Sequence, residues 1–296
     1  MRPLEIEAVL QEKMANILSL KEAAKTVSNL RRRDLLSYKK ELADKPESDQ
    51  LILTRINMLF WDASTGDQVY FGRIRRDLRD ELEMLDFQQN KQYSWLLTEA
   101  YEAFEDFLEH LYANAGSHDA DFWNPIHLKG ADLTSRDWEW CLKQAVSRLD
   151  ADEIMKQFRK KLPSFSRVET NNALGIDLRF TLEFIAQMRH HIVHTRGEVK
   201  DRDDFARKIL EKIGRWNNGK PSPYRDEIND VFFLPPHENT IALLERRINS
   251  DHFLPTHMDI MQNFCRALLS IARALTQALI THQATGADSP HTARLD

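Results

Sequence analysis

The sequence predicts an all-α protein, in which a helical bundle follows a helical N-terminal region. Only 9 glycines and 10 prolines occur among the 296 residues, so long stretches lack the residues that most often interrupt a helix. These stretches carry apolar residues at steps of three and four positions, which is the helical period. No run shows the period of two that is typical of a half-buried strand. A chain of this length can bury a sizeable core.

Composition and charge limit the classes of function. Hydrophobic residues make up 42% of the chain and charged residues 29%, and the net charge is -5 at pH 7. Proteins that coat nucleic acid broadly are usually basic, so we expect any RNA contact to come from a local patch or a small catalytic site. The two cysteines, Cys141 and Cys265, form no CxxC pair, which excludes a disulfide scaffold and a cysteine-built zinc site.

We expect a cytoplasmic protein with no membrane partner. No segment of the sequence approaches the run of about 18 apolar residues that a membrane helix needs. The first residues, Met1 to Glu7, mix acidic and basic side chains and lack the apolar centre of a secretory signal.

An N-terminal helical region is expected over residues 1–92. Its parts, in order, are a helix over 4–44, a break at 45–49, an apolar segment at 51–61, a turn at 64–67 and a helix over 72–88. The apolar stripe of the first helix consists of Leu10, Met14, Ile17, Ala24, Val27 and Leu30. Its spacing is close to a heptad, which allows a coiled coil, but packing on the protein's own core is the preferred interpretation.

The bundle is expected over residues 93–283, and a disordered tail over 284–296. Its predicted helices cover residues 93–115, 135–161, 175–196, 203–213 and 256–282. Gly116 and Gly197 are expected to end the first and third of these helices, and Pro163 to follow the second. The stripe of the last helix consists of Met261, Phe264, Leu268, Ala272, Leu275 and Leu279.

Two clusters in this region have both a structural and a functional interpretation. Lys156, Arg159, Lys160 and Lys161 make one helix end basic, which suits the helix dipole, with phosphate contact as the alternative. Trp123, Trp138 and Trp140 are expected to pack in the core, with stacking on bases as the alternative.

The residues most able to support chemistry lie near the end of the 175–196 helix. Arg189 and His194 are five positions apart, about 140° on a helical wheel, whereas His190 and His194 are four apart and share a face. Histidine exchanges protons near neutral pH, and arginine binds phosphate through a planar fork. Such a pair can cleave RNA without a metal, because the ribose 2′-oxygen can attack phosphorus while the guanidinium stabilises the growing charge.

The segment from Arg189 to Gly197 resembles the signature of the HEPN superfamily, an arginine, a polar residue, three further residues and a histidine, often with a glycine shortly after. The resemblance covers residues 93–283, with inserts at 116–134 and 198–252. It implies a dimerising all-α bundle and a metal-independent endoribonuclease, of the kind found in toxin–antitoxin and antiviral defence systems. By this resemblance Arg189 binds the scissile phosphate, His194 is the general acid and base, and His190 orients the site.

The partners expected from this interpretation are RNA and a second copy of the chain. No cofactor or metal is expected. The alternative function is a non-catalytic dimerisation or interaction module, whose N-terminal helices would bind an antitoxin or a sensor. A zinc site built from His190 and His194, with Glu183 nearby, is a weaker alternative. His191 is expected to be structural or simply exposed.

Overall fold

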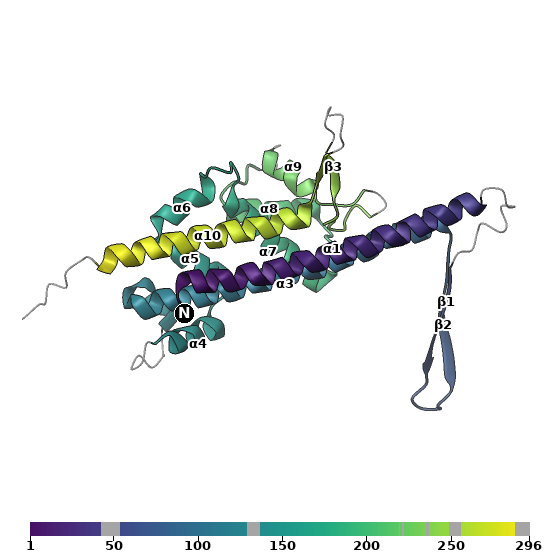
Figure 1. Cartoon of the computed structure of the whole chain (residues 1–296), viewed down its shortest axis with the longest axis horizontal. Helices are drawn as coiled ribbons and strands as arrows, with labels where there is room; N and C mark the ends of the chain where they lie inside the picture. The colour runs from purple at the N-terminus through teal and green to yellow at the C-terminus, as the bar shows by residue number, and fades with distance from the viewer. Residues whose placement is uncertain are drawn as a thin grey trace, which may run out of the picture. The chain divides into compact units, whose positions relative to one another are not determined.

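The computed structural model describes residues 1–42, 54–128, 137–218, 220, 222–234, 237–248 and 256–287 (Figure 1). The chain divides into two compact units. The larger one comprises Met1–Leu18 and Ser94–Asp296, and the smaller one comprises Ser19–Tyr93. The first 18 residues therefore belong with the bundle, and not to a separate region that ends at residue 92.

The larger unit is helical, which confirms the predicted all-α class. It contains the beginning of α1 (Pro3–Leu42), the later part of α3 (Leu78–His118), α4 (Trp138–Arg148), α5 (Ala151–Lys161), α6 (Pro163–Thr170), α7 (Leu178–Thr195), α8 (Arg202–Lys212), α9 (Pro223–Asn229) and α10 (Ile260–Ala287). Two 3-10 turns, Ala120–Phe122 and Pro125–Leu128, follow α3, and the short strands β3 (Arg246–Ile248) and β4 (Thr256–Met258) pair antiparallel before α10. The helix α7 contacts α6, α8 and α10.

Aspartate caps and prolines set helix boundaries that the apolar period does not predict. The single helix expected over 135–161 is wrong, because α4 ends at Arg148 and Asp150 starts a new helix by accepting the Glu153 backbone N–H at 2.8 Å. Pro163 does follow α5, but it also begins α6, at a position where its missing N–H costs nothing.

The core of the larger unit is built around α10. All six residues of its predicted stripe are buried, and the Phe264 ring lies 5.8 Å from the Phe184 ring of α7. By length and composition the segment Ile260–Thr285 could cross a membrane, but 56% of its apolar stretch is buried inside the protein, as in a bundle core. The helix begins at Ile260 and continues to Ala287, so the prediction of a disordered tail is wrong for residues 284–287. The rest of that tail lies outside the described residues.

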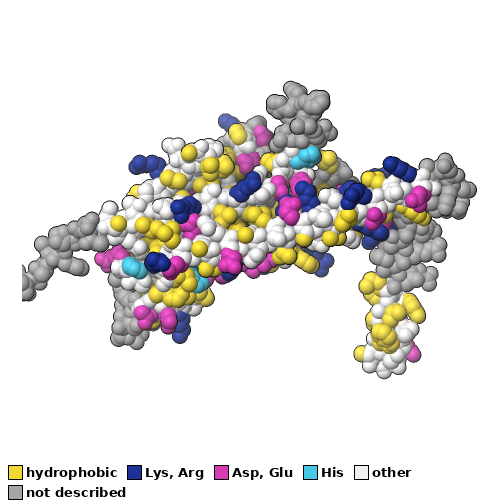
Figure 2. All heavy atoms as spheres, viewed as in Figure 1, with side chains coloured by type: hydrophobic (Ala, Val, Ile, Leu, Met, Phe, Trp, Pro, Cys, Tyr) yellow, Lys and Arg dark blue, Asp and Glu magenta, His cyan; other side chains and the backbone are white. Residues whose placement is uncertain are grey.

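The smaller unit contains a β-hairpin that the sequence analysis missed. Strands β1 (Thr54–Trp61) and β2 (Gln68–Arg76) pair antiparallel, so the helix expected over 72–88 is wrong for residues 72–76. The predicted turn lies between these strands, where the Asp62 carboxylate accepts the Ser64 backbone N–H at 2.7 Å. Hydrophobic side chains gather on the hairpin (Figure 2). The large exposed ones are Met58, Leu59, Phe60, Trp61, Tyr70 and Phe71. The break expected at 45–49 lies outside the described residues.

The helical part of the smaller unit is held together by charged groups as well as by apolar ones. Lys21 of α1 is fully buried, pairs with Glu22 at 2.8 Å and lies 5.6 Å from the centre of the Tyr93 ring of α3. Arg32 of α1 hydrogen-bonds to Asp86 of α3. The buried positions of α1 in this unit are Lys21, Ser28 and Leu35, whereas Val27 and Leu30 of the predicted stripe are exposed.

Gly116 does not end its helix, because α3 continues to His118. Its function is to let Trp123 approach the helix. The Trp123 indole N–H donates to the Tyr112 carbonyl at 2.9 Å, and the two rings stack 4.6 Å apart. A Cβ at position 116 would lie 2.2 Å from Nε1 of Trp123, which is far inside van der Waals contact.

We therefore expect Gly116→Ala to lower the free energy of unfolding by about 1–3 kcal/mol through overpacking. At a solvent-exposed position inside a helix, a glycine-to-alanine change would instead raise the free energy of unfolding by about 1 kcal/mol. Urea unfolding measures the difference. The loss of stability caused by Gly116→Ala should be smaller in a protein that also carries Trp123→Leu. If Gly116→Ala stabilises the protein, the close contact with Trp123 is wrong.

Candidate active site

The helix α7 places the candidate residues on its outer side. It begins at Asp177, whose carboxylate accepts the Phe180 backbone N–H at 3.0 Å and the Tyr224 hydroxyl at 2.9 Å. One face of the helix is buried in the bundle, and Met188 and Ile192 continue that face toward its C-terminal end. His190, Val193 and His194 lie away from that face and are exposed.

The three predicted catalytic residues lie on that outward side. His190 and His194 are exposed, and the side chain of Arg189 is 29% exposed. Val193, between the histidines, is an exposed apolar residue. Since His190 and His194 lie one turn apart, their rings come together, with centroids 4.6 Å apart and planes inclined by 51°.

Arg189 lies against the acidic surface of α3. Its Nη2 is 3.5 Å from Oε1 of Glu102, a long contact at the surface. Its positive charge also acts on Glu105, whose pKa is nevertheless raised because burial of that carboxyl outweighs the arginine. The Nε of Arg189 is buried and has no hydrogen-bond partner among the described residues. The one hydrogen bond of the guanidinium among the described residues is thus the long contact from Nη2 to Glu102.

The pKa of His190 is lowered from its ordinary value of 6.5. Partial burial is the largest cause, and the positive charges of His194, Arg189 and Lys208 add to it. His190 therefore lies within electrostatic range of both other candidate residues. Its imidazole is neutral at pH 7 and can accept a proton or a hydrogen bond.

His191 has a different environment and packs inward. Its ring lies 5.2 Å from the Phe205 ring of α8, and burial lowers its pKa. Two residues with left-handed backbone, Arg196 (φ 59°) and Gly197 (φ 84°), end the helix here, and the Gly197 N–H donates to the His191 carbonyl at 3.0 Å. Gly197 thus terminates the helix as predicted.

Glu183, the third ligand considered for a zinc site, already has other partners. Glu183 pairs with Lys212 at 2.8 Å and accepts a hydrogen bond from Gln187 at 3.0 Å. Over the described part of the chain, no group of three or more histidine, cysteine, aspartate or glutamate side chains could hold a metal ion.

The structure also brings together residues that the sequence analysis left apart. Lys156, Arg159 and Lys160 of α5 line a cavity together with Arg179 of α7 and Lys212 of α8. The sequence does not reveal that Arg179 and Lys212 belong to this cavity, because the α5 residues that line it with them are distant in the sequence. Of the three tryptophans considered for base stacking, Trp123 is buried, and Trp138 and Trp140 are half-buried.

Comparisons of the chain with protein-family models, with curated proteins and with solved structures found no match. Function must therefore be inferred from the geometry of the chain itself.

We expect the titration of His190 to report its two charged neighbours. Replacing His194 by glutamine removes one positive charge and should raise the pKa of His190, although the remaining burial keeps it below the ordinary histidine value. An NMR titration of the ring protons measures this pKa. His257→Gln, at an exposed position of β4, is the matched control and should leave the pKa of His190 unchanged. A His190 pKa that is insensitive to His194→Gln would show that the rings are not adjacent.

Proposed function

We propose that the protein is a metal-independent endoribonuclease of the HEPN type. The observation that supports this most is the pair of imidazoles 4.6 Å apart, next to Arg189, on an exposed face of one helix. A proton-transfer group beside a fixed positive charge is the minimum that RNA cleavage requires, because the ribose supplies its own nucleophile.

In the proposed reaction, His194 takes the proton of the ribose 2′-hydroxyl, and the 2′-oxygen forms a bond to phosphorus. The bond from phosphorus to the 5′-oxygen breaks, and that oxygen takes up the proton that His194 removed from the 2′-hydroxyl, which returns His194 to its neutral form. The products are a 2′,3′-cyclic phosphate and a 5′-hydroxyl. His190 lies against the His194 ring, so a hydrogen bond or a contact from its neutral ring orients His194.

Arg189 is proposed to bind the scissile phosphate. Its contact with Glu102 is long, so a phosphodiester can replace it without breaking a strong hydrogen bond. A guanidinium binds two phosphoryl oxygens at once, and it stabilises the charge that grows on them as the fifth bond to phosphorus forms.

A homodimer and RNA are the partners in this proposal. None of the three candidate residues lines the cavity on the upstream part of α7. A second copy placed over Val193 would cover an exposed apolar side chain and enclose the RNA between two sets of catalytic residues.

Arg189→Ala and His194→Ala are each expected to reduce RNA cleavage by about 100-fold or more. Neither side chain is in the core, so circular dichroism and the elution volume of the protein should not change. Cleavage is measured with purified protein and labelled RNA in a buffer that contains EDTA.

The matched controls replace an arginine and a histidine at exposed positions elsewhere in the larger unit. Arg167→Ala on α6 and His257→Ala on β4 should cleave at the parent rate. If the Arg189 and His194 variants also cleave at that rate, the assigned active site is wrong. If EDTA abolishes cleavage by the parent protein, the reaction depends on a metal.

A second candidate function, a non-catalytic interaction module, is favoured by one observation. The hairpin of the smaller unit exposes Trp61 and Tyr70 by 63% and 65%, and large exposed aromatic side chains are typical of binding surfaces. In that case a partner such as an antitoxin or a sensor would bind the N-terminal unit, and the purified protein would leave RNA intact.

A further inference from the structure

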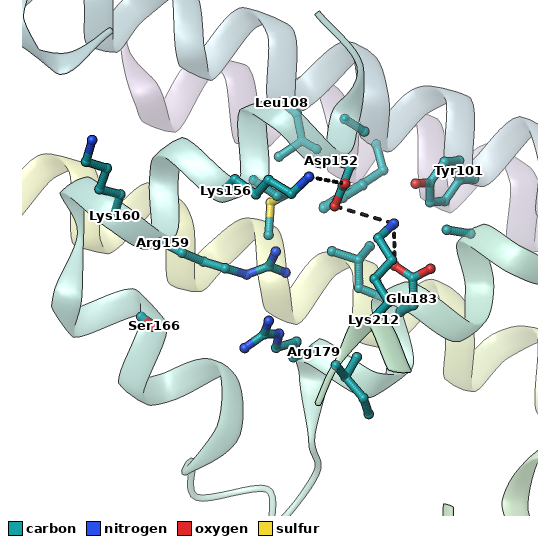
Figure 3. A pocket seen from close by; sticks show the side chains of 16 residues that line it. Tyr101, Leu108, Asp152, Lys156, Arg159, Lys160, Ser166, Arg179, Glu183 and Lys212 are labelled. Atoms are coloured by element: carbon teal, nitrogen blue, oxygen red, sulfur yellow. Dashed lines mark ion pairs between the residues drawn. The ribbon is translucent and has the colours of Figure 1, made fainter. Parts of the chain in front are cut away.

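A cavity of about 450 Å3 lies in the larger unit between α3, α5, α7 and α8 (Figure 3). Small-molecule sites in proteins commonly have volumes of about 300–1,000 Å3. Its position on α7 is upstream of Arg189, and it uses none of the proposed catalytic residues. It is therefore a separate feature that needs its own explanation.

The cavity wall is strongly basic in an acidic protein. Its cationic side chains are Lys156, Arg159, Lys160, Arg179 and Lys212, whereas its carboxylates are Asp152 and Glu183. The net charge of the wall is thus three positive, and two positive when Glu169 behind Arg159 is included. The whole chain, by contrast, has a net charge of -5. Helix-dipole stabilisation explains Arg159, Lys160 and Lys212, which lie in the last turns of α5 and α8. It does not explain Arg179, which lies in the first turn of α7, where a positive charge is unfavourable.

The two lysines nearest the carboxylates are already paired. Lys156 bonds to Asp152 at 2.8 Å, and Lys212 lies 2.8 Å from Glu183 and 3.4 Å from Asp152. These pairs close one side of the cavity, as the dashed lines in Figure 3 show. They leave Arg159 and Arg179 as the arginines available to a ligand, and Lys160 lines the cavity farther along α5 (Figure 3).

Two hydrogen bonds to Glu169 hold the Arg159 guanidinium in place. The Glu169 carboxylate, whose side chain is 1% exposed, accepts hydrogen bonds from Nε at 2.9 Å and from Nη2 at 2.6 Å. Nη1 has no bond to any described residue and can donate into the cavity. A buried carboxylate that fixes an arginine lowers the ordering entropy that a ligand must overcome.

Arg179 faces Arg159 from the opposite side. In Figure 3 the two guanidinium groups extend toward each other across the open space. Within the described part of the chain, the side chains of Arg179 and Lys160 form no ion pair and no hydrogen bond. Two guanidinium groups that approach each other repel one another unless an anion lies between them.

We propose that this cavity binds a small molecule with a phosphate group, of about the size of a nucleotide, through Arg159, Arg179 and Lys160. The free Nη1 of Arg159 and the guanidinium fork of Arg179 together offer more donors than the two oxygens of a carboxylate need, and they suit the several oxygens of a phosphate. Tyr101 and Phe104 of α3 also line the cavity and supply an apolar wall for the rest of the molecule. Burial raises the pKa of Tyr101, so its hydroxyl stays protonated and can donate to the ligand.

Isothermal titration calorimetry of the full chain tests the proposal with ADP, inorganic pyrophosphate and adenosine as probes. ADP and pyrophosphate should bind, and adenosine should not. Arg179→Gln should weaken ADP binding by about tenfold or more, since a charge-assisted bond is lost. Lys160→Gln, at an exposed position that cannot affect folding strongly, should weaken it several-fold. Arg167→Gln on α6 removes the same charge outside the cavity and should have no effect.

Three results would overturn the proposal. The first is no binding of ADP or pyrophosphate up to about 1 mM. The second is ADP binding that Lys160→Gln and folded Arg179→Gln protein both leave unchanged. The third is displacement of bound ADP by an oligonucleotide without a terminal phosphate, which would make the cavity part of an RNA-binding surface. Because the readout is binding, none of these results depends on whether the α7 residues cleave RNA.

Discussion

The burial of one face of α7 against α10 is the constraint on which the rest of the account depends. Phe184 of α7 contacts Phe264 of α10, and Met188 and Ile192 extend the same buried face. Removing this apolar surface from water sets the rotation of α7 about its own axis. Once that rotation is set, the helical period places Arg189, His190 and His194 on the outside, where imidazoles can titrate and a guanidinium can meet a phosphate.

Sequence reasoning could predict the elements that follow a long apolar period. The stripe from Met261 to Leu279 is buried as predicted, because a repeat of three and four positions defines a single face. Boundaries were less predictable, since they depend on single side chains. Asp150 divides one expected helix into two, and Gly116 lies inside a helix because Trp123 needs the space above it. Such effects come from hydrogen bonds and close approach, which a periodic pattern does not contain.

Other features could not be predicted because they depend on residues distant in the sequence. The arginines that face each other across the cavity belong to α5 and α7, and Glu169, which positions one of them, belongs to α6. The β-hairpin was missed for a different reason. Apolar residues such as Phe60, Trp61, Tyr70 and Phe71 occupy consecutive positions in its strands and are exposed, so no alternation between a buried and a solvated face marks it. For the candidate site, the sequence predicted the residues and the shared face of His190 and His194, whereas their exposure and the ring distance of 4.6 Å required the structure.

The chemistry of the RNA ends tests the central proposal most directly. Attack by the ribose 2′-oxygen, driven by an imidazole and a guanidinium, leaves a 2′,3′-cyclic phosphate on one fragment and a 5′-hydroxyl on the other. Attack by an activated water can instead leave a 3′-hydroxyl and a 5′-phosphate. Mass spectrometry of fragments released by the purified protein in EDTA distinguishes the two outcomes. We expect cyclic phosphate ends, whereas 5′-phosphate ends or intact RNA would show that Arg189 and His194 do not cleave RNA in the proposed way.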